Sequence, residues 1–272
     1  MSVSLNIIGY LLPQSSSTSA LTSLVTGTSG STTTDPAQAI AALKSAQKNE
    51  AKEVANTLKK PQVERDLKRF AAVVAKATKP EDVLNDRTAR TVLLTANGLG
   101  ASADAVGLAK RALLGDLSSA RHPANQLADT QPGWLATART LDFKNRGMAV
   151  LKDAATLKSI TEAYGQIRWQ EDLESRAPGL SFAISFVKDL GKVDSAIKVL
   201  GNRVAREVVT GAFGIPQQIA FQPLSTQAAV IERRVNVEKL GDQGYREEIA
   251  RKYLISRNAS SFSSGGITSL YA

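Results

Sequence analysis

The sequence predicts an all-α fold, and three observations lead to that prediction. Hydrophobic residues make up 43% of the chain but aromatic residues only 5%, so its cores would be filled mainly by Ala, Val, Leu and Ile. Such side chains suit closely packed helices better than a sheet rich in aromatic pairs. Apolar residues recur at helical spacing in several segments, and we find no sustained alternation with a period of two. We therefore expect helices and no substantial sheet.

The first structured element should begin at Asp35-Pro36, because Asp is a good N-cap and Pro suits the first helical position. A long helix is expected over Ala37–Lys59, which contains neither Gly nor Pro. A second helix should start at Pro61 and end near Thr78-Lys79-Pro80, where a short helix follows. One apolar stripe runs along the second helix and consists of Val63, Leu67, Phe70, Val73 and Val74.

The next element occurs twice, because the pattern of residues 83–92 is echoed without gaps by residues 199–208. Both segments carry apolar residues at the same helical positions, so both should turn the same stripe towards a core. Each predicted helix has an N-cap and a glycine stop: Asp86 and Gly98 in the first, Asn202 and Gly214 in the second. This echo predicts an internal duplication.

The duplication divides the chain into two tandem, similar helical subdomains with a tail at each end. We expect a flexible tail over residues 1–34, helical repeat 1 over 35–146, helical repeat 2 over 147–258, and a second flexible tail over 259–272. The Ser, Thr and Gly in the tails, and their lack of charge, leave too little apolar surface to offset the entropy of ordering. The second repeat should open with a long helix within Asp153–Arg176.

The chain has a formal net charge of +9, which is typical of proteins that bind nucleic acids or anionic surfaces. Its cations are scattered in pairs with acids between them, as at Lys68-Arg69 and Glu247-Glu248, and form no continuous run. We therefore interpret them as solvated helix faces. Similarly, we expect Trp134 and Trp169 to anchor helices to the core and not to stack on bases.

Residues that carry catalysis are scarce. The absence of cysteine excludes disulfides, thiolate metal sites and cysteine nucleophiles. The only histidine, His122, precedes a proline in a polar stretch and is expected to be exposed. We identify no phosphate-binding or dinucleotide-binding loop. The sequence therefore predicts no catalytic residue, no cofactor or metal site and no small-molecule substrate, and no segment approaches the roughly 20 apolar residues of a membrane span.

Two arginine pairs are the most specific polar signal: Arg87 with Arg90, and Arg203 with Arg206. Their i, i+3 spacing places both guanidinium groups of a pair on one side of a helix. One interpretation is a partner-binding site, because arginine favours bidentate recognition of carboxylates. The other is an intramolecular cap or ion pair that stabilises each repeat.

Several of these residues also resemble a known family. They are Val83-Leu84-x-Asp86-Arg87 with Gly98-Leu99, and Val199-Leu200 through Ala212–Pro216 followed by Gln227 and Leu240-x-Asp242. They resemble the bacterial domain-of-unknown-function family twelve-seventeen, whose genes occur among flagellar genes. The resemblance covers the region from about Lys48 to Arg257. It implies tandem all-helical subdomains, and it supplies no catalytic residue that could be assigned to this chain.

The resemblance implies a non-enzymatic flagellum-associated structural or assembly protein that contacts other flagellar proteins. Like substrates of the flagellar export route, this chain lacks cysteine and a convincing signal peptide, so we expect it to be exported and attached to the flagellum. Two alternatives remain open: a cytoplasmic helical adaptor or chaperone for flagellar assembly, and a basic nucleic-acid-binding regulator. The sequence predicts no oligomeric state.

Overall fold

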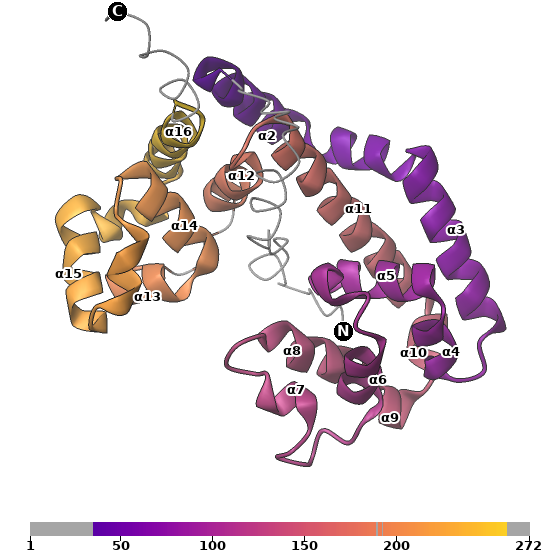
Figure 1. The fold of residues 1–272 in the computed structure, drawn as a ribbon. Coiled ribbons are helices and arrows are strands. Elements are labelled where there is room, and N and C mark those ends of the chain that lie inside the picture. Colours follow the sequence, from indigo (N-terminus) through magenta and orange to yellow (C-terminus); the bar gives the residue numbers. More distant parts are fainter. Residues whose placement is uncertain (1–34, 189, 192, 260–272) are drawn as a thin grey trace, which may run out of the picture. The chain divides into compact units, whose positions relative to one another are not determined.

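Helices joined by short loops make up the chain, and no strand occurs among the described residues (Figure 1). The computed structural model describes residues 35–188, 190–191 and 193–259. In the first half of the chain, the elements are α2 (Pro36–Leu58), α3 (Pro61–Lys76), α4 (Pro80–Asn85), α5 (Arg87–Ala96), the 3-10 helix η2 (Gly100–Ser102), α6 (Val106–Leu114), α7 (Pro123–Gln126), α8 (Pro132–Leu141), α9 (Phe143–Arg146) and α10 (Ala149–Lys152). In the second half, they are α11 (Ala154–Arg176), α12 (Leu180–Lys188), α13 (Ala196–Gly201), α14 (Arg203–Ala212), the 3-10 helix η3 (Gln217–Phe221), α15 (Leu224–Arg234), the 3-10 helix η4 (Val237–Gly241) and α16 (Gln243–Ala259).

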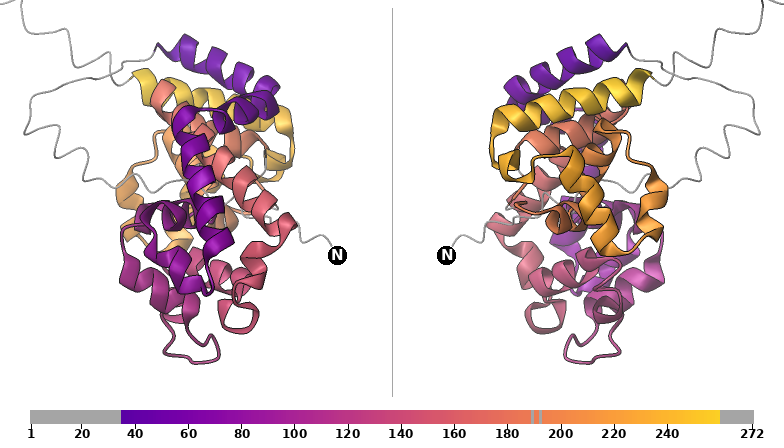
Figure 2. Two further views of the ribbon diagram at one scale, coloured as in Figure 1. Left: turned by 90° about the vertical axis from the view of Figure 1, so that its right-hand side faces the viewer. Right: turned by 90° about the vertical axis from the view of Figure 1, so that its left-hand side faces the viewer.

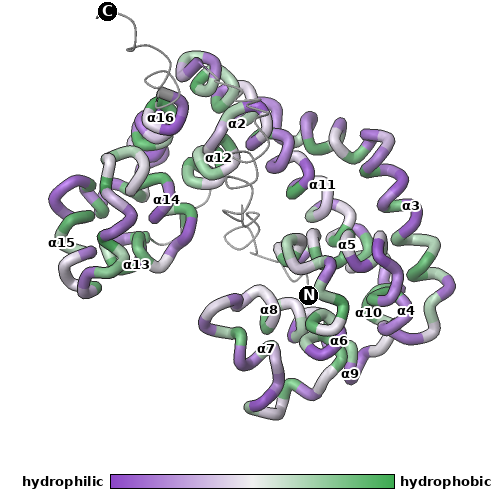
Figure 3. The backbone as a smooth tube through the Cα atoms, viewed as in Figure 1, coloured by the Kyte–Doolittle hydropathy of each residue, from purple (hydrophilic) through white to green (hydrophobic). Residues whose placement is uncertain are grey.

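The predicted all-α fold is confirmed, as are several helix boundaries. α2 begins at Pro36 and α3 at Pro61, each at the proline that the sequence indicated. Val63, Phe70 and Val74 of the predicted stripe are buried, and hydrophilic and hydrophobic residues alternate along α3 (Figure 3). Such alternation at helical spacing places one face of the helix against a core.

The described residues form two units by their internal contacts. One unit consists of residues 51–169, and the other combines residues 35–50 with 170–259. The boundaries fall within the long helices α2 and α11, so they do not coincide with the predicted repeats 35–146 and 147–258. The predicted division after residue 146 lies inside the first unit. The tandem subdomains therefore stay a prediction, and the predicted tails lie outside the described residues apart from Ala259.

In the unit of residues 51–169, the core lies among α3, α4, α5, α6 and α8. α3 packs on α5, and α6 packs on both α4 and α8. The largest fully buried side chains include Phe70, Leu84, Leu93, Leu94, Trp134, Leu141 and Leu151. The predicted anchoring role of Trp134 is confirmed, because its ring is fully buried and its Nε1 donates to the side chain of Gln131 at 3.1 Å. Trp169 is also fully buried, and its Nε1 donates to Glu53.

In the other unit, α12, α14 and α16 pack against one another (Figure 2), and α13 packs on both α14 and α15. The buried side chains include Phe186, Val199, Val208, Ile231, Tyr253 and Leu254. Lys188 at the end of α12 donates to Glu50 of α2 at 2.6 Å. α13 therefore connects α15, on which η3 packs, to the group of three helices.

Both predicted glycine stops are confirmed. Gly98 and Gly214 have φ angles of 73° and 58°, in the left-handed region that favours glycine. After Gly98, the backbone N–H of Leu99 donates to the Leu94 carbonyl in the last helical turn at 2.8 Å. After Gly214, the N–H of Ile215 donates in the same way to the Thr210 carbonyl at 2.9 Å. This is the Schellman arrangement, which satisfies carbonyls that a helix end would leave without a partner.

The expectation that His122 is exposed was wrong. The side chain is 5% exposed, and its Nδ1 accepts the backbone N–H of Ala124 at 3.2 Å, so that it caps α7. The ring lies against Gly115, where a Cβ would come within 2.5 Å of the His122 Nε2 atom. The ring is buried because it fits against Gly115 in addition to forming the capping bond.

Candidate protein-interaction surface

The first of the predicted arginine pairs lies at the corner between α4 and α5. Asp86 is the N-cap of α5, and its Oδ1 accepts the backbone N–H of Ala89 at 2.9 Å. Arg90 lies one turn into α5, and its Nη1 donates back to the Leu84 carbonyl at 2.7 Å. The aspartate satisfies a free N–H at the start of one helix, and the arginine satisfies a free carbonyl at the end of the other.

The corner between α13 and α14 contains the same two bonds. The Oδ1 of Asn202 accepts the N–H of Ala205 at 3.0 Å, and Nη1 of Arg206 donates to the Leu200 carbonyl at 2.7 Å. The two corners thus share the pattern Leu-x-Asx-x-x-x-Arg, which matches the echo found in the sequence.

A third corner of this kind joins η4 to α16. Asp242 accepts the N–H of Tyr245 at 2.7 Å, and Nη1 of Arg246 donates to the Leu240 carbonyl, also at 2.7 Å. Nε of Arg246 donates in addition to the Val187 carbonyl of α12 at 3.1 Å, which connects this corner to a neighbouring helix.

These bonds show where the four predicted partner-binding arginines lie. Arg90 and Arg206 bond to the carbonyls of their own corners, as the intramolecular interpretation expects. Arg87 is exposed, and its Nη2 lies 3.3 Å from Oδ1 of the equally exposed Asp104. Arg203 is half-buried over the ring of Phe182, 5.7 Å from its centroid, and burial lowers the pKa of its guanidinium. The two members of each pair therefore meet different partners and do not form one bidentate site.

The segments that follow the two glycine stops differ. After Gly98 the chain turns through η2 towards the first corner, and the Ala103 carbonyl accepts Nε of Arg90 at 2.6 Å. Arg90 is consequently only 4% exposed. After Gly214 the chain continues through Pro216 into η3, and Arg206 stays exposed. The second segment forms a separate feature of the surface.

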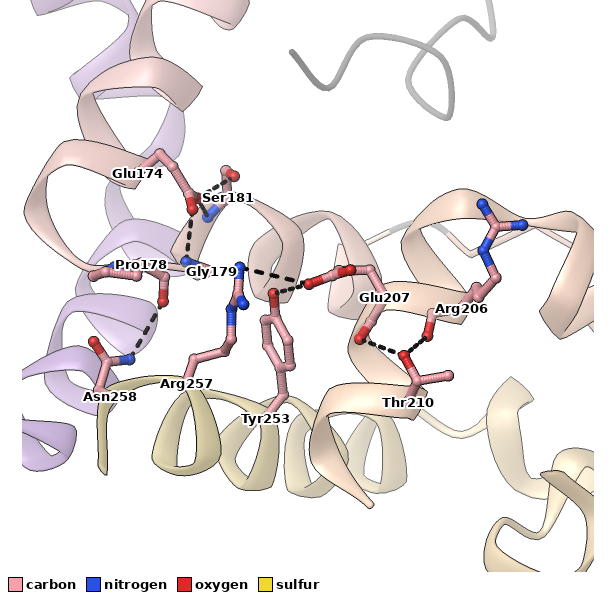
Figure 4. Close-up of polar contacts among 10 residues, drawn as sticks. All are labelled: Glu174, Pro178, Gly179, Ser181, Arg206, Glu207, Thr210, Tyr253, Arg257 and Asn258. Carbon is pink, nitrogen blue, oxygen red and sulfur yellow. Dashed lines mark hydrogen bonds and ion pairs between the residues drawn. The ribbon is translucent and has the colours of Figure 1, made fainter. Parts of the chain in front are cut away.

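Helix α14, from which that segment leaves, is held to α16 by a polar cluster (Figure 4). The Tyr253 hydroxyl of α16 donates to Oε1 of Glu207 in α14 at 3.1 Å, and Nη2 of Arg257 lies 3.7 Å from the same oxygen. Burial and the Glu207 carboxylate raise the pKa of Tyr253. The phenol therefore stays protonated and remains a donor.

Glycines allow the Tyr253 ring to fit between neighbouring elements. A Cβ at Gly211 of α14 would lie 2.6 Å from Cδ2 of the ring, and one at Gly179 would lie 2.7 Å from Cε1. Gly179 also has a φ of 85°. Its turn is closed by Glu174, which accepts the Gly179 N–H at 2.7 Å and the Ser181 hydroxyl at 2.6 Å (Figure 4). The start of α12 and the middle of α14 are thereby fixed around one ring.

Residues 216–226, which we call the Phe221 loop, form the most exposed apolar feature of this unit. The loop comprises Pro216, η3 and the first turn of α15. Phe221 is 90% exposed and Leu224 is 54% exposed, whereas Phe70 and Phe186 are buried in the two cores. Ile197, which is 57% exposed, lies on α13, and α13 packs on α15 as η3 does.

Hydrogen bonds brace the Phe221 loop. The side-chain amide of Gln227 donates to the Gln222 carbonyl at 2.8 Å and to the Ala220 carbonyl at 3.4 Å. Within η3, the N–H of Ile219 donates to the Pro216 carbonyl at 3.1 Å. Two prolines further restrict the backbone on either side of η3. The loop is therefore preorganised to hold Phe221 towards solvent, which lowers the entropy lost on binding.

The Phe221 loop also lies in an uncharged stretch. No Asp, Glu, Lys or Arg occurs between Glu207 and Glu232, although charged residues make up 22% of the chain. The exposed polar side chains of the loop are amides and hydroxyls, among them Gln217, Gln218 and Gln222. Aromatic residues surrounded by uncharged polar groups are typical of the centre of a protein interface, from which charged residues are depleted.

Two clefts on the unit of residues 51–169 offer no comparable site. One lies between α3 and α4, where Nη2 of Arg69 is 2.6 Å from Oδ2 of Asp86. The other is lined by Asp116 and Lys144, which form an ion pair that lowers the pKa of Asp116. Neither histidine nor cysteine is among the described residues that line these clefts. Each cleft thus contains one ion pair, Arg69 with Asp86 in the first and Lys144 with Asp116 in the second.

Within the described ranges of the chain, His, Asp and Glu side chains do not gather in groups of three that could hold a metal ion. None of the helices in that part of the chain combines the length and apolar character needed to cross a membrane.

The sequence matches the model of a family described as "Protein of unknown function (DUF1217)" over residues 96–245, which is more than half of the chain. The chain belongs to the DUF1217 family. The match is single, so it gives no evidence for the two copies predicted from the echo. It contains the α13–α14 corner and the whole Phe221 loop, whereas the α4–α5 corner precedes it. No curated protein matches this DUF1217 chain.

The fold of the DUF1217 chain is similar to that of protein AGR_C_984 from Agrobacterium tumefaciens, known from an X-ray crystal structure. The TM-score is 0.59 and the sequence identity is 20%, and the match covers 79% of this chain and 90% of the other. At this identity the likeness shows the fold alone.

Proposed function

We propose that this DUF1217 protein is a non-enzymatic structural or assembly protein of the bacterial flagellum that acts by binding other proteins. The observation that carries the proposal is the Phe221 loop. Its phenylalanine is 90% exposed on a braced, uncharged segment. Exposed aromatic anchors of this kind contribute a large share of the binding energy in protein interfaces.

The roles of the candidate polar residues support binding through this loop. His122 is occupied as a buried helix cap. Arg90 and Arg206 bond to carbonyls of their own corners. Because Arg90 and Arg206 serve the fold, neither pair offers two free guanidinium groups to a partner, and we place the partner-binding surface on the Phe221 loop.

The flagellar part of the proposal rests on the resemblance that the sequence shows to a family whose genes occur among flagellar genes. Under this proposal the protein is exported by the flagellar route and attached to the flagellum. Fractionation of a tagged chain tests its location: the protein should co-purify with hook–basal bodies or filaments. A chain found only in the cytoplasm would contradict export.

A second experiment tests the binding surface. A tagged full-length chain is recovered from cells that are building flagella, alongside the variants Phe221→Ser and Ile255→Ser. Ile255 is a matched control because it is also an exposed apolar residue, at 45%, but lies on α16. Flagellar proteins should be enriched with the wild type and with the control and be lost with Phe221→Ser. Equal recovery with all three chains would contradict the proposal.

A further inference from the structure

We propose that α15 and the Phe221 loop together bind an acidic amphipathic helix of another protein. The apolar side chains of that helix would lie on Phe221, and its carboxylates would contact the cations at the far end of α15. This inference rests on the proposed function only in using the Phe221 loop, and it adds the chemistry of the partner. Three observations carry it: the course of the loop along α15, the cations beside Phe213, and the placement of the neighbouring acids.

The Phe221 loop and the residues before it run antiparallel to α15. Near the start of α15, the side chain of Gln227 donates to the Ala220 and Gln222 carbonyls at 3.4 and 2.8 Å. At the end of α15, Nη1 of Arg234 donates to the Phe213 carbonyl at 3.0 Å. Gln227 and Arg234 are seven residues apart and therefore lie on one face of the helix. The loop thus follows this face, with Phe221 near the first turn and Phe213 beside the last.

Cations gather at the Phe213 end of this surface. We call Arg233, Arg234 and Lys252 the basic cluster. Nζ of Lys252 lies 5.6 Å from the centroid of the half-buried Phe213 ring. In the part of the chain that the structure describes, neither Arg233 nor Arg234 forms an ion pair, and both are exposed. The Phe213 carbonyl occupies one donor of Arg234 and fixes its position, so the remaining donors of the guanidinium can bind a carboxylate.

The nearby acids leave the two arginines with a net positive charge. Glu232 is the only acid in α15, and it precedes Arg234 by two residues, so it points from the opposite side of the helix. Oε1 of Glu248 lies 2.9 Å from Nζ of Lys252, and Glu207 accepts the Tyr253 hydroxyl at 3.1 Å. Glu248 therefore balances Lys252, whereas no carboxylate of the fold balances Arg233 and Arg234 in the described residues.

The surface thus has an uncharged apolar end and a basic end, which specifies the partner. Leu224 and Arg234 are the two ends of α15, and a helix of this length spans about 15 Å. Interfaces place apolar groups at the centre and charges at the rim, so the partner should carry apolar groups and carboxylates about the same distance apart. A helix with acids in its first turns meets this need, because the helix dipole stabilises acids there.

The charge of the whole chain favours the same partner. The formal net charge of +9 attracts an acidic protein and repels a second copy of this chain or a basic segment. Phe221 supplies the apolar anchor, and the basic cluster supplies the orientation, because carboxylates at the wrong end of the partner would face the uncharged loop. The partner is therefore an acidic helix held in one direction along α15.

The first test uses a synthetic peptide as the probe. This fluorescein-labelled, helix-forming peptide of about 20 residues has Glu in its first two turns and Leu and Phe in its last two. Fluorescence anisotropy follows its binding to the full-length chain from about 0.1 to about 100 μM. Binding should saturate in this range, and a peptide with Lys in place of Glu should bind at least about tenfold more weakly. No binding of the Glu peptide, or equal binding of both peptides, would overturn the inference.

The second test locates the binding site. Arg233→Glu combined with Arg234→Glu should weaken binding of the Glu peptide by at least about tenfold, and so should Phe221→Ser. Arg111→Glu combined with Arg139→Glu is the matched control, because both arginines are exposed in the last turns of their helices and the net charge changes equally. The control should change binding by less than about threefold. Equal weakening by both double variants would overturn the site.

Circular dichroism verifies that each variant keeps the helical content of the wild type. Arg233→Glu alone removes no hydrogen bond from the described part of the fold, so it tests the basic cluster without disturbing the bond between Arg234 and Phe213. This single variant should weaken binding of the Glu peptide by about threefold or more. Unchanged binding would contradict a contact between the basic cluster and the peptide.

The outcomes separate this inference from the proposed function. A chain that does not bind the Glu peptide but loses flagellar proteins on Phe221→Ser would overturn the acidic partner and leave protein binding through the loop standing. A chain that binds the Glu peptide through Phe221 and the basic cluster but recovers no flagellar protein would support the inference and contradict the proposed function.

Discussion

The α4–α5 and α13–α14 corners have the same sequence pattern and the same two hydrogen bonds, but their arginines end in different surroundings. Arg90 is 4% exposed, whereas Arg206 is exposed and bonds to a corner carbonyl only through Nη1. The two bonds that the corners share are local, because they join residues three and six positions apart in the sequence. Whether its arginine becomes part of a core depends on the segment that follows the next glycine.

The two junctions differ in the residue that stands two positions after each glycine stop. Gly100 follows the first stop, and a Cβ there would lie 2.8 Å from Oγ1 of Thr95, so glycine allows the close approach that folds η2 back. Pro216 occupies the matching place after the second stop. After Pro216 the chain continues into η3. After the first junction η2 folds back over Arg90, whereas after the second junction the chain leads into the Phe221 loop.

The largest effect should follow from removing the buried arginine. Arg90→Ala leaves the Leu84 and Ala103 carbonyls without their donor, and bonds to charged donors contribute about 1.5–3 kcal/mol each before relaxation. We expect a loss of about 2–4 kcal/mol in the free energy of unfolding, measured by urea denaturation. Arg206→Ala should cost less than about 1 kcal/mol, because water can replace the exposed donor. Equal losses in the two variants would show that the burial of Arg90 by η2 does not contribute to the free energy of unfolding.

A smaller effect is expected from closing the approach at η2. Gly100→Ala places a methyl group against Thr95 and should cost about 1 kcal/mol through overpacking. Pro216→Ala, at the matching exposed position, should cost less than about 0.5 kcal/mol. Thermal unfolding of the two variants beside the wild type compares them directly. If Pro216→Ala proved the more damaging, the two junctions would not differ as described.

The smallest effect concerns acid, because of the two corners compared only the α4–α5 corner has an ionisable cap. Burial alone would raise the pKa of Asp86, but the Ala89 N–H and the Arg69 guanidinium bind its carboxylate and lower that pKa overall. A carboxyl group whose pKa is lower in the folded state stabilises the fold above its ordinary pKa, and this contribution fades as the pH falls towards the folded value. Asn202 does not titrate.

Asp86→Asn should therefore cost about 1 kcal/mol or less near pH 6, and its stability should approach that of the wild type near pH 3. Urea denaturation at both pH values measures the difference. Because the other carboxyl groups titrate alike in both chains, their contributions cancel. A difference that does not change with pH would mean that the Asp86 charge is not what stabilises the cap.

Local signals in the sequence were sufficient to predict the helices and their caps. The two N-caps and the two glycine stops shape the chain within one or two helical turns, and all four lie at the helix ends where their residue types indicated. They are Asp86, Asn202, Gly98 and Gly214. Burial could not be predicted in the same way. The burial of Arg90 depends on the return of η2, and that of His122 on the fit of its ring against Gly115.

The exposed Phe221 loop could not be predicted from periodicity in the sequence, because a 3-10 helix between two prolines shows no helical stripe. Its signal was present in another form, as the lack of charge from Val208 to Ile231. Such a stretch in the middle of a chain resembles a buried segment, and only the structure shows that residues 216–218 and 220–226 are exposed. The unit boundaries within α2 and α11 were also beyond local signals, since each of these helices is continuous in sequence.

The interrupted course of one unit has a consequence for how the protein forms during translation. Residues 51–169 are contiguous, so this unit can fold as soon as it leaves the ribosome. The other unit begins with residues 35–50 and must wait for α16, whose Tyr253 ring fills the space between Gly179 and Gly211. The unit of residues 51–169 therefore folds first during synthesis. The surface that carries Phe221 is supported only after α16 has emerged.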